Sequence, residues 1–323
     1  MAASKISAVW LLLALVIAMA NGQGLKVGFY VKTCPSVESI VKKTIDDVIA
    51  VSPSLGGPLL RMHFHDCFVR GCDGSVLLNS TQDSQAEKDS IPNLSLRGYQ
   101  IIDRAKSAVE KECPDVVSCA DIVALVARDV TVALKGPSWN VETGRRDGRV
   151  SISNEALTNL PSPFSNITTL IQGWQRKGLT PKDLVVLSGS HTIGTSHCPA
   201  FTNRLYNFTG KGDTDPSLDS NYIAELKKKC APNDQTTLVE MDPGSFKTFD
   251  KNYYALVRKR RGLFQSDSAL LNSSKTRIYV RHQAEHFKSS FFEDFGNSMV
   301  KMGRIEVLTG SAGEIRKVCG RVN

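Results

Sequence analysis

The sequence is poor in long hydrophobic runs: beyond residue 20, none reaches the roughly 20 apolar residues that a membrane-spanning helix needs. The one early run, residues 8–20, follows Lys5 and ends in Ala18-Met19-Ala20. A cationic start, an apolar run of about 13 residues and small residues at its end are typical of a secretory signal peptide. We therefore expect residues 1–22 to be a signal peptide and the mature protein to be secreted, with no membrane anchor.

The sequence also lacks internal repeats, a linker rich in Gly, Pro or Ser, and a nucleic-acid-binding motif. Residues 23–323 are therefore expected to form one large or two-lobed domain. The 40 Lys and Arg exceed the 32 Asp and Glu by 8, or by 7 once Lys5 is removed. This excess predicts a basic surface rather than a DNA-binding site, and it fits a purely solubilising charge equally well.

No cysteine is left without a possible partner, since the chain has eight. An even number of cysteines in a secreted chain predicts a disulfide scaffold, here of four bridges. Spacing alone leaves about a hundred connectivities open.

Strand-like segments are scarce, and residues 150–152 are the clearest of them. Apolar residues recur instead at spacings of three and four, which is the period of a helix packed on one face. Helices are predicted over residues 36–49, 53–64, 96–109, 115–134, 166–177, 181–187, 250–261 and 290–302. Residues 198–230 are polar and are expected to form a loop. The sequence therefore predicts an all-α fold whose two lobes share one cleft.

Two of the six histidines have informative neighbours. Arg61 and His65 are four residues apart, so on a helix they share one face and bring a base next to a fixed cation. His191 follows an apolar segment, where a lone imidazole can hold a metal from one side. By residue type alone, His63, His65 and Cys67 could instead bind zinc, although a disulfide at Cys67 would exclude this.

These histidines lie in two strings that resemble the secretory plant (class III) haem peroxidases. The strings are Arg61-Met62-His63-Phe64-His65-Asp66-Cys67 and Leu187-Ser188-Gly189-Ser190-His191-Thr192-Ile193-Gly194. The resemblance extends from about residue 23 to residue 319. It implies the haem peroxidase fold, one haem b, two calcium ions, and the reduction of hydrogen peroxide to water with one-electron oxidation of small phenolic donors. It also implies a monomer exported to the cell wall, where a basic surface would face acidic polysaccharide; relatives sent to the vacuole usually have a longer C-terminal tail.

On one side of the haem, the resemblance makes His65 the base that moves the peroxide proton and Arg61 its partner in breaking the O–O bond. Phe64 would shield the iron, and Asn93 would accept the other ring N–H of His65. Pro161 would orient phenolic donors. A neutral imidazole and a guanidinium suit these roles, because the cation disfavours protonation of the base and stabilises negative charge on a departing oxygen.

On the other side, the resemblance makes His191 the axial ligand of the haem iron and Asp267 the carboxylate that orients it. Met241 stands where some relatives have an aromatic residue. Reading Ser190 and His191 as a hydrolase pair fails, because adjacent residues do not present a nucleophile and its base to one another.

The resemblance also implies two calcium sites built from oxygen ligands. The distal set, on the side of the haem that faces His65, is Asp66, Val69, Gly71, Asp73, Ser75 and Glu87. The proximal set, on the side of His191, is Thr192, Asp242, Ser245, Thr248 and Asp250. The implied disulfides are Cys34–Cys113, Cys67–Cys72, Cys119–Cys319 and Cys198–Cys230. Asp121, costly to bury alone, would pair with Arg145 as a structural contact.

Five sequons begin at Asn79, Asn93, Asn166, Asn207 and Asn272. Asn93 is expected to lack a glycan because the resemblance places it in the active site. A calcium-stabilised wall glycoprotein without enzymatic activity remains the alternative function.

Overall fold

The computed structural model describes residues 24–285 and 289–323. The expected signal peptide lies outside the described residues. Most described residues with regular structure are helical, so the prediction of an all-α fold is confirmed. The α-helices are α2 (Val37–Val51), α3 (Gly56–Val69), α4 (Tyr99–Glu112), α5 (Cys119–Ala133), α6 (Ser153–Asn159), α7 (Ile167–Arg176), α8 (Pro181–Ser188), α9 (Asn203–Tyr206), α10 (Ser220–Lys229), α11 (Asn252–Arg258), α12 (Gln265–Ala269), α13 (Ser274–Glu285) and α14 (Phe291–Met302).

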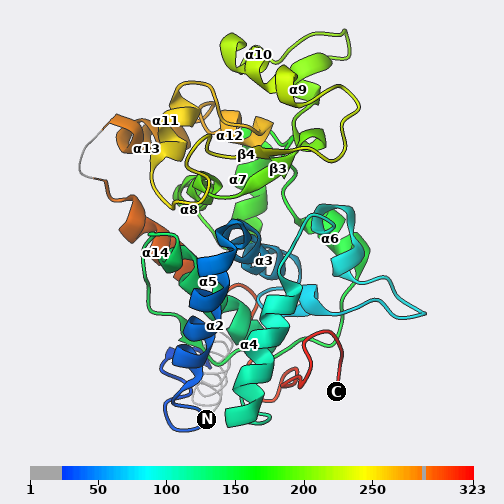
Figure 1. Cartoon of the computed structure of the whole chain (residues 1–323), viewed down its shortest axis with the longest axis vertical. Helices are drawn as coiled ribbons and strands as arrows, with labels where there is room; N and C mark the ends of the chain where they lie inside the picture. Colours follow the sequence, from blue (N-terminus) through cyan, green and yellow to red (C-terminus); the bar gives the residue numbers. More distant parts are fainter. Residues whose placement is uncertain (1–23, 286–288) are drawn as a thin grey trace, which may run out of the picture.

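Helices α2, α3 and α4 pack around α5. Helices α7, α13 and α14 pack on α8, α11 contacts the 3₁₀ turn that follows it, and α12 contacts α7. Figure 1 shows α2, α4 and α5 in the lower part of the molecule and α7, α8, α11, α12 and α13 in the upper part, with α3 between them. Helix α5 is buried on nearly every side, which suits its run of Val, Leu, Ile and Ala. The side chain of Ser118 caps its first turn by accepting a hydrogen bond from the backbone N–H of Asp121 at 3.1 Å.

Within residues 24–285 and 289–323, strands are confined to two short antiparallel pairs. Strand β1 (Lys26–Val27) pairs with β2 (Glu142–Thr143), and β3 (Thr195–His197) pairs with β4 (Leu238–Glu240). The expected strand at residues 150–152 is wrong, since this segment is irregular and leads into α6. Its β-branched side chains suggest a strand, but the neighbouring segment contacts it only through isolated hydrogen bonds, such as that from Ser153 N to the Gln85 carbonyl at 2.8 Å, and no ladder forms.

The expectation of a loop over residues 198–230 is also wrong. This segment holds α9 and α10, and it has a small apolar core of its own that packs against β4 and the start of α12. Inside it, the Arg204 guanidinium forms an ion pair with Asp215 at 2.7 Å, and both side chains are almost completely buried. The apolar residues of this segment are sparse along the chain, so they show no helical period in the sequence. A disulfide and an ion pair bring them together in space. Figure 1 shows α9 and α10 at the top of the molecule.

All four disulfides are formed with the expected pairing: Cys34–Cys113, Cys67–Cys72, Cys119–Cys319 and Cys198–Cys230. The third joins residues 200 positions apart and ties the C-terminal segment to the first turn of α5. Long closed loops of this kind restrict the unfolded chain most strongly.

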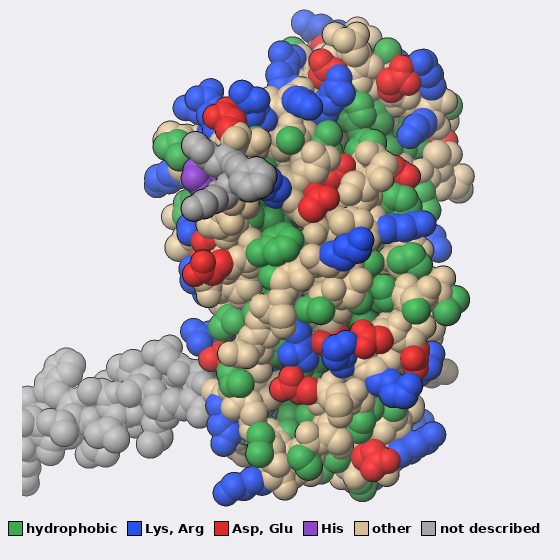
Figure 2. Space-filling model, turned by 60° about the vertical axis from the view of Figure 1, so that its left-hand side comes forward, with side chains coloured by type: hydrophobic (Ala, Val, Ile, Leu, Met, Phe, Trp, Pro, Cys, Tyr) green, Lys and Arg blue, Asp and Glu red, His purple; other side chains and the backbone are tan. Residues whose placement is uncertain are grey.

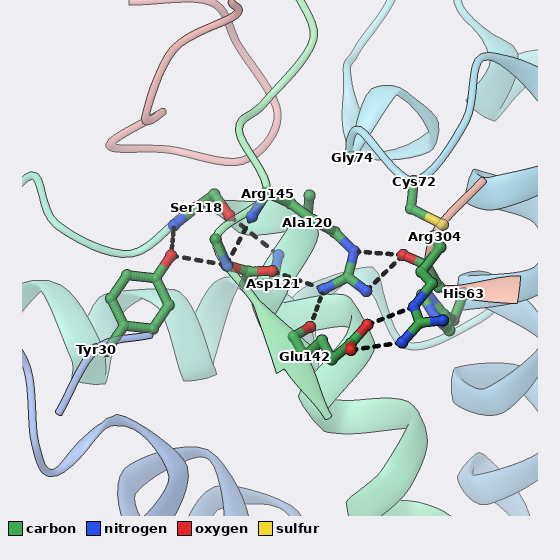
Figure 3. Close-up of polar contacts among 12 residues, drawn as sticks. Tyr30, His63, Cys72, Gly74, Ser118, Ala120, Asp121, Glu142, Arg145 and Arg304 are labelled. Atoms are coloured by element: carbon green, nitrogen blue, oxygen red, sulfur yellow. Dashed lines mark hydrogen bonds and ion pairs between the residues drawn. The ribbon is translucent and has the colours of Figure 1, made fainter. Parts of the chain in front are cut away.

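A buried polar network connects the lower helices (Figure 3). Asp121 is fully buried and accepts hydrogen bonds from the Tyr30 hydroxyl at 2.7 Å and from Arg145 Nη1 at 2.8 Å. Arg145 also donates to the carbonyl of Gly303, from Nε at 3.0 Å and from Nη2 at 2.6 Å. The Asp121–Arg145 contact therefore holds α5 against the end of α14, which is the structural role expected of it.

Candidate active site

Helix α3 carries the first group of candidate residues. Its helical period sets Arg61 one turn before His65, and Arg61 Nε donates a hydrogen bond to His65 Nε2 at 2.8 Å. The same guanidinium donates to Ser95 Oγ at 2.9 Å and to the Pro92 carbonyl at 2.8 Å. Burial lowers the pKa of Arg61 to about 10, so the group stays charged at neutral pH. Three hydrogen bonds from the Arg61 guanidinium therefore hold the cation next to the imidazole.

The other ring nitrogen of His65 contacts Asn93. His65 Nδ1 lies 2.5 Å from Asn93 Oδ1, and Asn93 Nδ2 donates to the Glu87 carbonyl at 2.7 Å. Since the amide nitrogen is engaged elsewhere, its oxygen faces the ring, and His65 carries its proton on Nδ1. Burial, and then the Arg61 charge, hold the pKa of His65 well below its usual range, with the Asn93 contact acting in the opposite direction. The imidazole is therefore a neutral base with its lone pair on Nε2.

Phe64 borders this pair on the side of α7. Its ring meets the His65 ring edge-on at 5.4 Å between centroids and stacks on Trp174 at 6.1 Å. Pro161 lies in the loop between α6 and α7, which is fastened to α12 by the hydrogen bond from Ser266 N to the Pro163 carbonyl at 2.9 Å. This hydrogen bond ties the loop that holds Pro161 to the helix that carries Asp267.

The second histidine lies in a short 3₁₀ helix, Gly189–Thr192, directly after α8. His191 Nδ1 donates to Asp267 Oδ1 at 2.8 Å, and about a third of the His191 side chain is exposed. With Nδ1 engaged, Nε2 is the nitrogen that can bind iron.

Asp267 has two further donors. The Tyr253 hydroxyl donates to Oδ1 at 2.8 Å, and the Phe264 backbone N–H donates to Oδ2 at 2.8 Å. Burial alone would raise the pKa of Asp267, but His191 and the other donors hold it below its usual range. The carboxylate is therefore charged where it meets the imidazole. Met241, the departure noted in the sequence, is buried in the small core beside β4.

The residues expected at the distal calcium site include a group of buried oxygens, beginning with Asp66 directly after His65. Asp66 Oδ1, Ser75 Oγ and both Glu87 carboxylate oxygens are buried without a hydrogen-bond partner. Burial, and then the charges of Asp73 and Glu87, raise the pKa of Asp66 well above its usual value, and burial raises that of Glu87 to about 8. Such oxygens are costly to bury unless a cation compensates them, so they fit a hard metal ion.

Two backbone positions, Val69 and Gly71, are also expected in the distal set. Gly71 has φ +89°, and a Cβ there would lie 2.5 Å from the Glu306 carbonyl oxygen, so only glycine fits. The Val69 carbonyl accepts a hydrogen bond from Lys177 Nζ at 3.2 Å.

The residues expected at the proximal calcium site also come together, and Thr192 among them directly follows His191. Thr192 Oγ1 lies 3.1 Å from Asp250 Oδ1 and 3.4 Å from Asp242 Oδ2, and Ser245 Oγ lies 3.2 Å from Asp250 Oδ2. Burial is the main cause that raises the pKa of Asp242 to about 6. The Thr248 backbone N–H donates to the Ser245 carbonyl at 2.8 Å.

The zinc alternative is wrong. His63 does lie beside the two sulfurs of Cys67 and Cys72, but these sulfurs are joined in a disulfide and cannot act as thiolate ligands. His65 points instead to Arg61 and Asn93. His63 is buried against the disulfide, with Cys67 Sγ 3.6 Å from its Nδ1.

Several contributing residues were not predicted from the sequence. Ser95 accepts a hydrogen bond from Arg61, and Trp174 stacks on Phe64. Asn252 donates to Asp242 at 2.8 Å, and the Tyr253 hydroxyl donates to Asp267. Local sequence around these residues carries no signal for such contacts, because each one bridges separate elements.

Of the five sequons, Asn93 is buried, whereas Asn79, Asn166, Asn207 and Asn272 are exposed. This distribution agrees with the expectation that Asn93 carries no glycan.

Comparison with known proteins adds independent evidence. The family model described as peroxidase matches residues 37–286. The chain is 67% identical to Peroxidase 27 of Arabidopsis thaliana over 324 residues, covering all of both chains. It is 63% identical to Peroxidase 56 of the same species over 95% of this chain and 93% of the relative, and 59% identical to Peroxidase 1 of Oryza sativa subsp. japonica over 97% of each. With this extent of identity and with its helices and disulfides arranged as described, the chain belongs to the plant class III peroxidases and is a peroxidase enzyme.

Proposed function

We propose that this peroxidase binds one haem b through His191 and two calcium ions, and that it reduces hydrogen peroxide at the Arg61–His65 pair while oxidising small phenolic donors. Haem and calcium are the cofactors that membership of the family implies. The observation that carries the proposal is the pair of oriented histidines: His65 is a neutral base held by Asn93, and His191 is held by Asp267 with Nε2 free for a metal.

When bound, the haem iron supplies the redox centre that accepts oxidising equivalents from peroxide and electrons from donors. The distal residues supply the proton transfers. His65 Nε2 takes the proton from one peroxide oxygen and returns it to the other, which then leaves as water. In the structure this nitrogen accepts a hydrogen bond from Arg61 Nε, so peroxide would take the place of that donor. Arg61 would then stabilise the negative charge on the departing oxygen.

Asn93 contributes by fixing the tautomer of His65. If the proton moved to Nε2, the imidazole would present a donor to peroxide and could not act as the base. The hydrogen bond from Nδ1 to Asn93 Oδ1 disfavours that tautomer. On the other side, Asp267 would increase the electron donation of His191 by drawing on its Nδ1 proton.

Two calcium ions would hold these groups in place. The distal set begins at Asp66, the residue after the distal base, and the proximal set begins at Thr192, the residue after the iron ligand. Each ion would neutralise carboxylates that burial makes costly, and so would fix the end of the segment that carries a histidine. Glu87 would join the distal site through its uncompensated oxygens.

Phenolic donors would bind near Pro161, next to Phe164, whose side chain is partly exposed. Phe64 would keep them from the iron and so favour single-electron transfer at the edge of the haem. The loop is anchored next to Asp267 by the Ser266–Pro163 hydrogen bond, which keeps this surface close to the proximal side.

Residues 1–22 would direct the monomeric enzyme to the cell wall. No described helix is long and apolar enough to cross a membrane. On the face shown in Figure 2, Lys and Arg are scattered with acidic side chains between them. An attraction to acidic polysaccharide would then arise from distributed charge and weaken with added salt.

The test is to purify the haem-loaded protein and its Arg61→Leu, His65→Ala and His191→Ala variants. A Soret band and peroxide-dependent oxidation of phenolic donors are expected for the wild type. Arg61→Leu and His65→Ala should retain the band and turn over far more slowly than the wild type, whereas His191→Ala should lose the normal axial ligation. A wild type that stays colourless with added hemin, or distal variants with undiminished turnover, would contradict the proposal.

A further inference from the structure

One oxygen of the Asp267 carboxylate accepts hydrogen bonds from two side chains. His191 Nδ1 and the Tyr253 hydroxyl both donate to Oδ1, each at 2.8 Å, while Oδ2 is occupied by the Phe264 backbone N–H. Asp267 is almost completely buried, so water does not provide a substitute donor. The negative charge available to the histidine therefore depends on how much of it the tyrosine withdraws.

Tyr253 is held rigidly for this contact. It lies in α11, is buried, and meets the His191 ring edge-on at 5.9 Å between centroids. On its other side it packs edge-on against Tyr254 at 5.3 Å. A phenylalanine at this position could keep both ring contacts, and only the hydroxyl makes the hydrogen bond to Asp267.

A hydrogen bond to a charged acceptor shifts electron density toward its donor and makes the acceptor a weaker base for any other donor. With the tyrosine hydroxyl in place, Oδ1 pulls less strongly on the His191 N–H. The histidine then has less imidazolate character and donates less charge through Nε2.

We propose that Tyr253 is a positioning residue that limits the electron donation of His191 to the haem iron through its hydrogen bond to Asp267. This inference depends on the proposed role of His191 as the iron ligand. It concerns a residue that touches neither peroxide nor the phenolic donor.

The neighbouring tyrosine provides a matched control. Tyr254 follows in the same helix and is equally buried, but its hydroxyl lies 3.2 Å from the Val185 carbonyl and 3.3 Å from the Val186 carbonyl. Removing that hydroxyl deletes a buried hydrogen bond without touching Asp267. A general effect of removing a tyrosine hydroxyl from α11 would therefore appear in both variants.

The experiment compares Tyr253→Phe, Tyr254→Phe and wild type as haem-loaded proteins. The readouts are the iron–histidine stretching frequency of the ferrous form by resonance Raman spectroscopy and the ferric/ferrous reduction potential. For Tyr253→Phe we expect a higher frequency and a lower potential, because Oδ1 then interacts with His191 alone. For Tyr254→Phe we expect wild-type values in both measurements. Wild-type values for Tyr253→Phe, or equal shifts in the two variants, would overturn the inference.

A second measurement covers the case in which Tyr253→Phe fails to fold. Global replacement of tyrosine by 3-fluorotyrosine makes each hydroxyl a stronger donor while preserving its shape. We expect a lower iron–histidine frequency in the fluorinated wild type and an unaltered frequency in fluorinated Tyr254→Phe relative to that fluorinated wild type. A fluorinated wild type with the original frequency would contradict the inference. Absence of any iron–histidine band in the unmodified wild type would instead contradict the proposed function.

Discussion

The orientation of His65 by Asn93 yields the sharpest quantitative prediction. Asn93→Leu preserves the size of the side chain but removes the acceptor for His65 Nδ1–H. The Glu87 carbonyl would keep the hydrogen bond from Ser90 N at 2.9 Å, so the perturbation is concentrated on the histidine. A buried donor left without a partner costs about 1–3 kcal/mol. That cost disfavours the tautomer protonated on Nδ1 relative to the one protonated on Nε2, which cannot act as the base. Since about 1.4 kcal/mol corresponds to a factor of ten, the population of the reactive tautomer, and with it the rate of the peroxide reaction, should fall by roughly 5- to 150-fold.

The assay is the second-order rate constant for hydrogen peroxide, followed by stopped flow at the Soret band. Asn93→Asp is the matched variant, because it retains an oxygen acceptor and adds a negative charge. Its rate should stay closer to wild type at high pH, while its acidic limit should move to higher pH because the carboxylate raises the pKa of His65. A rate for Asn93→Leu within twofold of wild type at every pH would refute the orienting role of Asn93.

Three further predictions concern charge, metal and stability. In the wild type, burial and Arg61 lower the pKa of His65, so the acidic limit of the peroxide reaction should lie below pH 6.5. In a pH–rate profile, Arg61→Leu should move this limit upward by about 1–3 units. An unmoved limit would contradict the electrostatic coupling between Arg61 and His65. Complete calcium removal by a chelator should lower turnover while far-ultraviolet circular dichroism retains its helical signal, and unchanged turnover would argue against the calcium role. Asp121→Asn leaves the buried Arg145 charge uncompensated and should lower the unfolding free energy by about 3–5 kcal/mol in denaturant titrations. The control, Glu142→Gln at a more exposed ion pair, should cost no more than about 1 kcal/mol, and equal losses would undermine the role of burial.

The helices most accurately predicted from the sequence are those with one continuous apolar face. Helix α2 has six buried residues at helical spacing, and α14 has a comparable stripe, so both were recognisable. Helix α13 was missed because its mean hydropathy is low and only three of its residues are buried. In α10 the apolar residues are likewise few, and their partners come from β4 and from the Cys198–Cys230 loop.

The candidate site shows the same division. Arg61 and His65 could be paired from spacing, because four residues on one helix fix their proximity. The partners Asn93 and Asp267 were assigned through family resemblance, since 28 and 76 residues separate them from their histidines. Neither residue spacing nor the family resemblance indicated a role for Tyr253, and only the structure shows its hydrogen bond to Asp267.

The sequence alone determined the helical periods, the proximity of the base and the guanidinium on α3, and the even number of cysteines. Which cysteines pair, which oxygens are buried together and how many donors meet at Asp267 were decided by the packing of distant segments. The physical reason is that hydrogen bonds, burial and charge act over a few ångströms in space, whatever the separation along the chain. Local sequence therefore specifies the base and the ligand, and tertiary packing sets how strongly each of them acts.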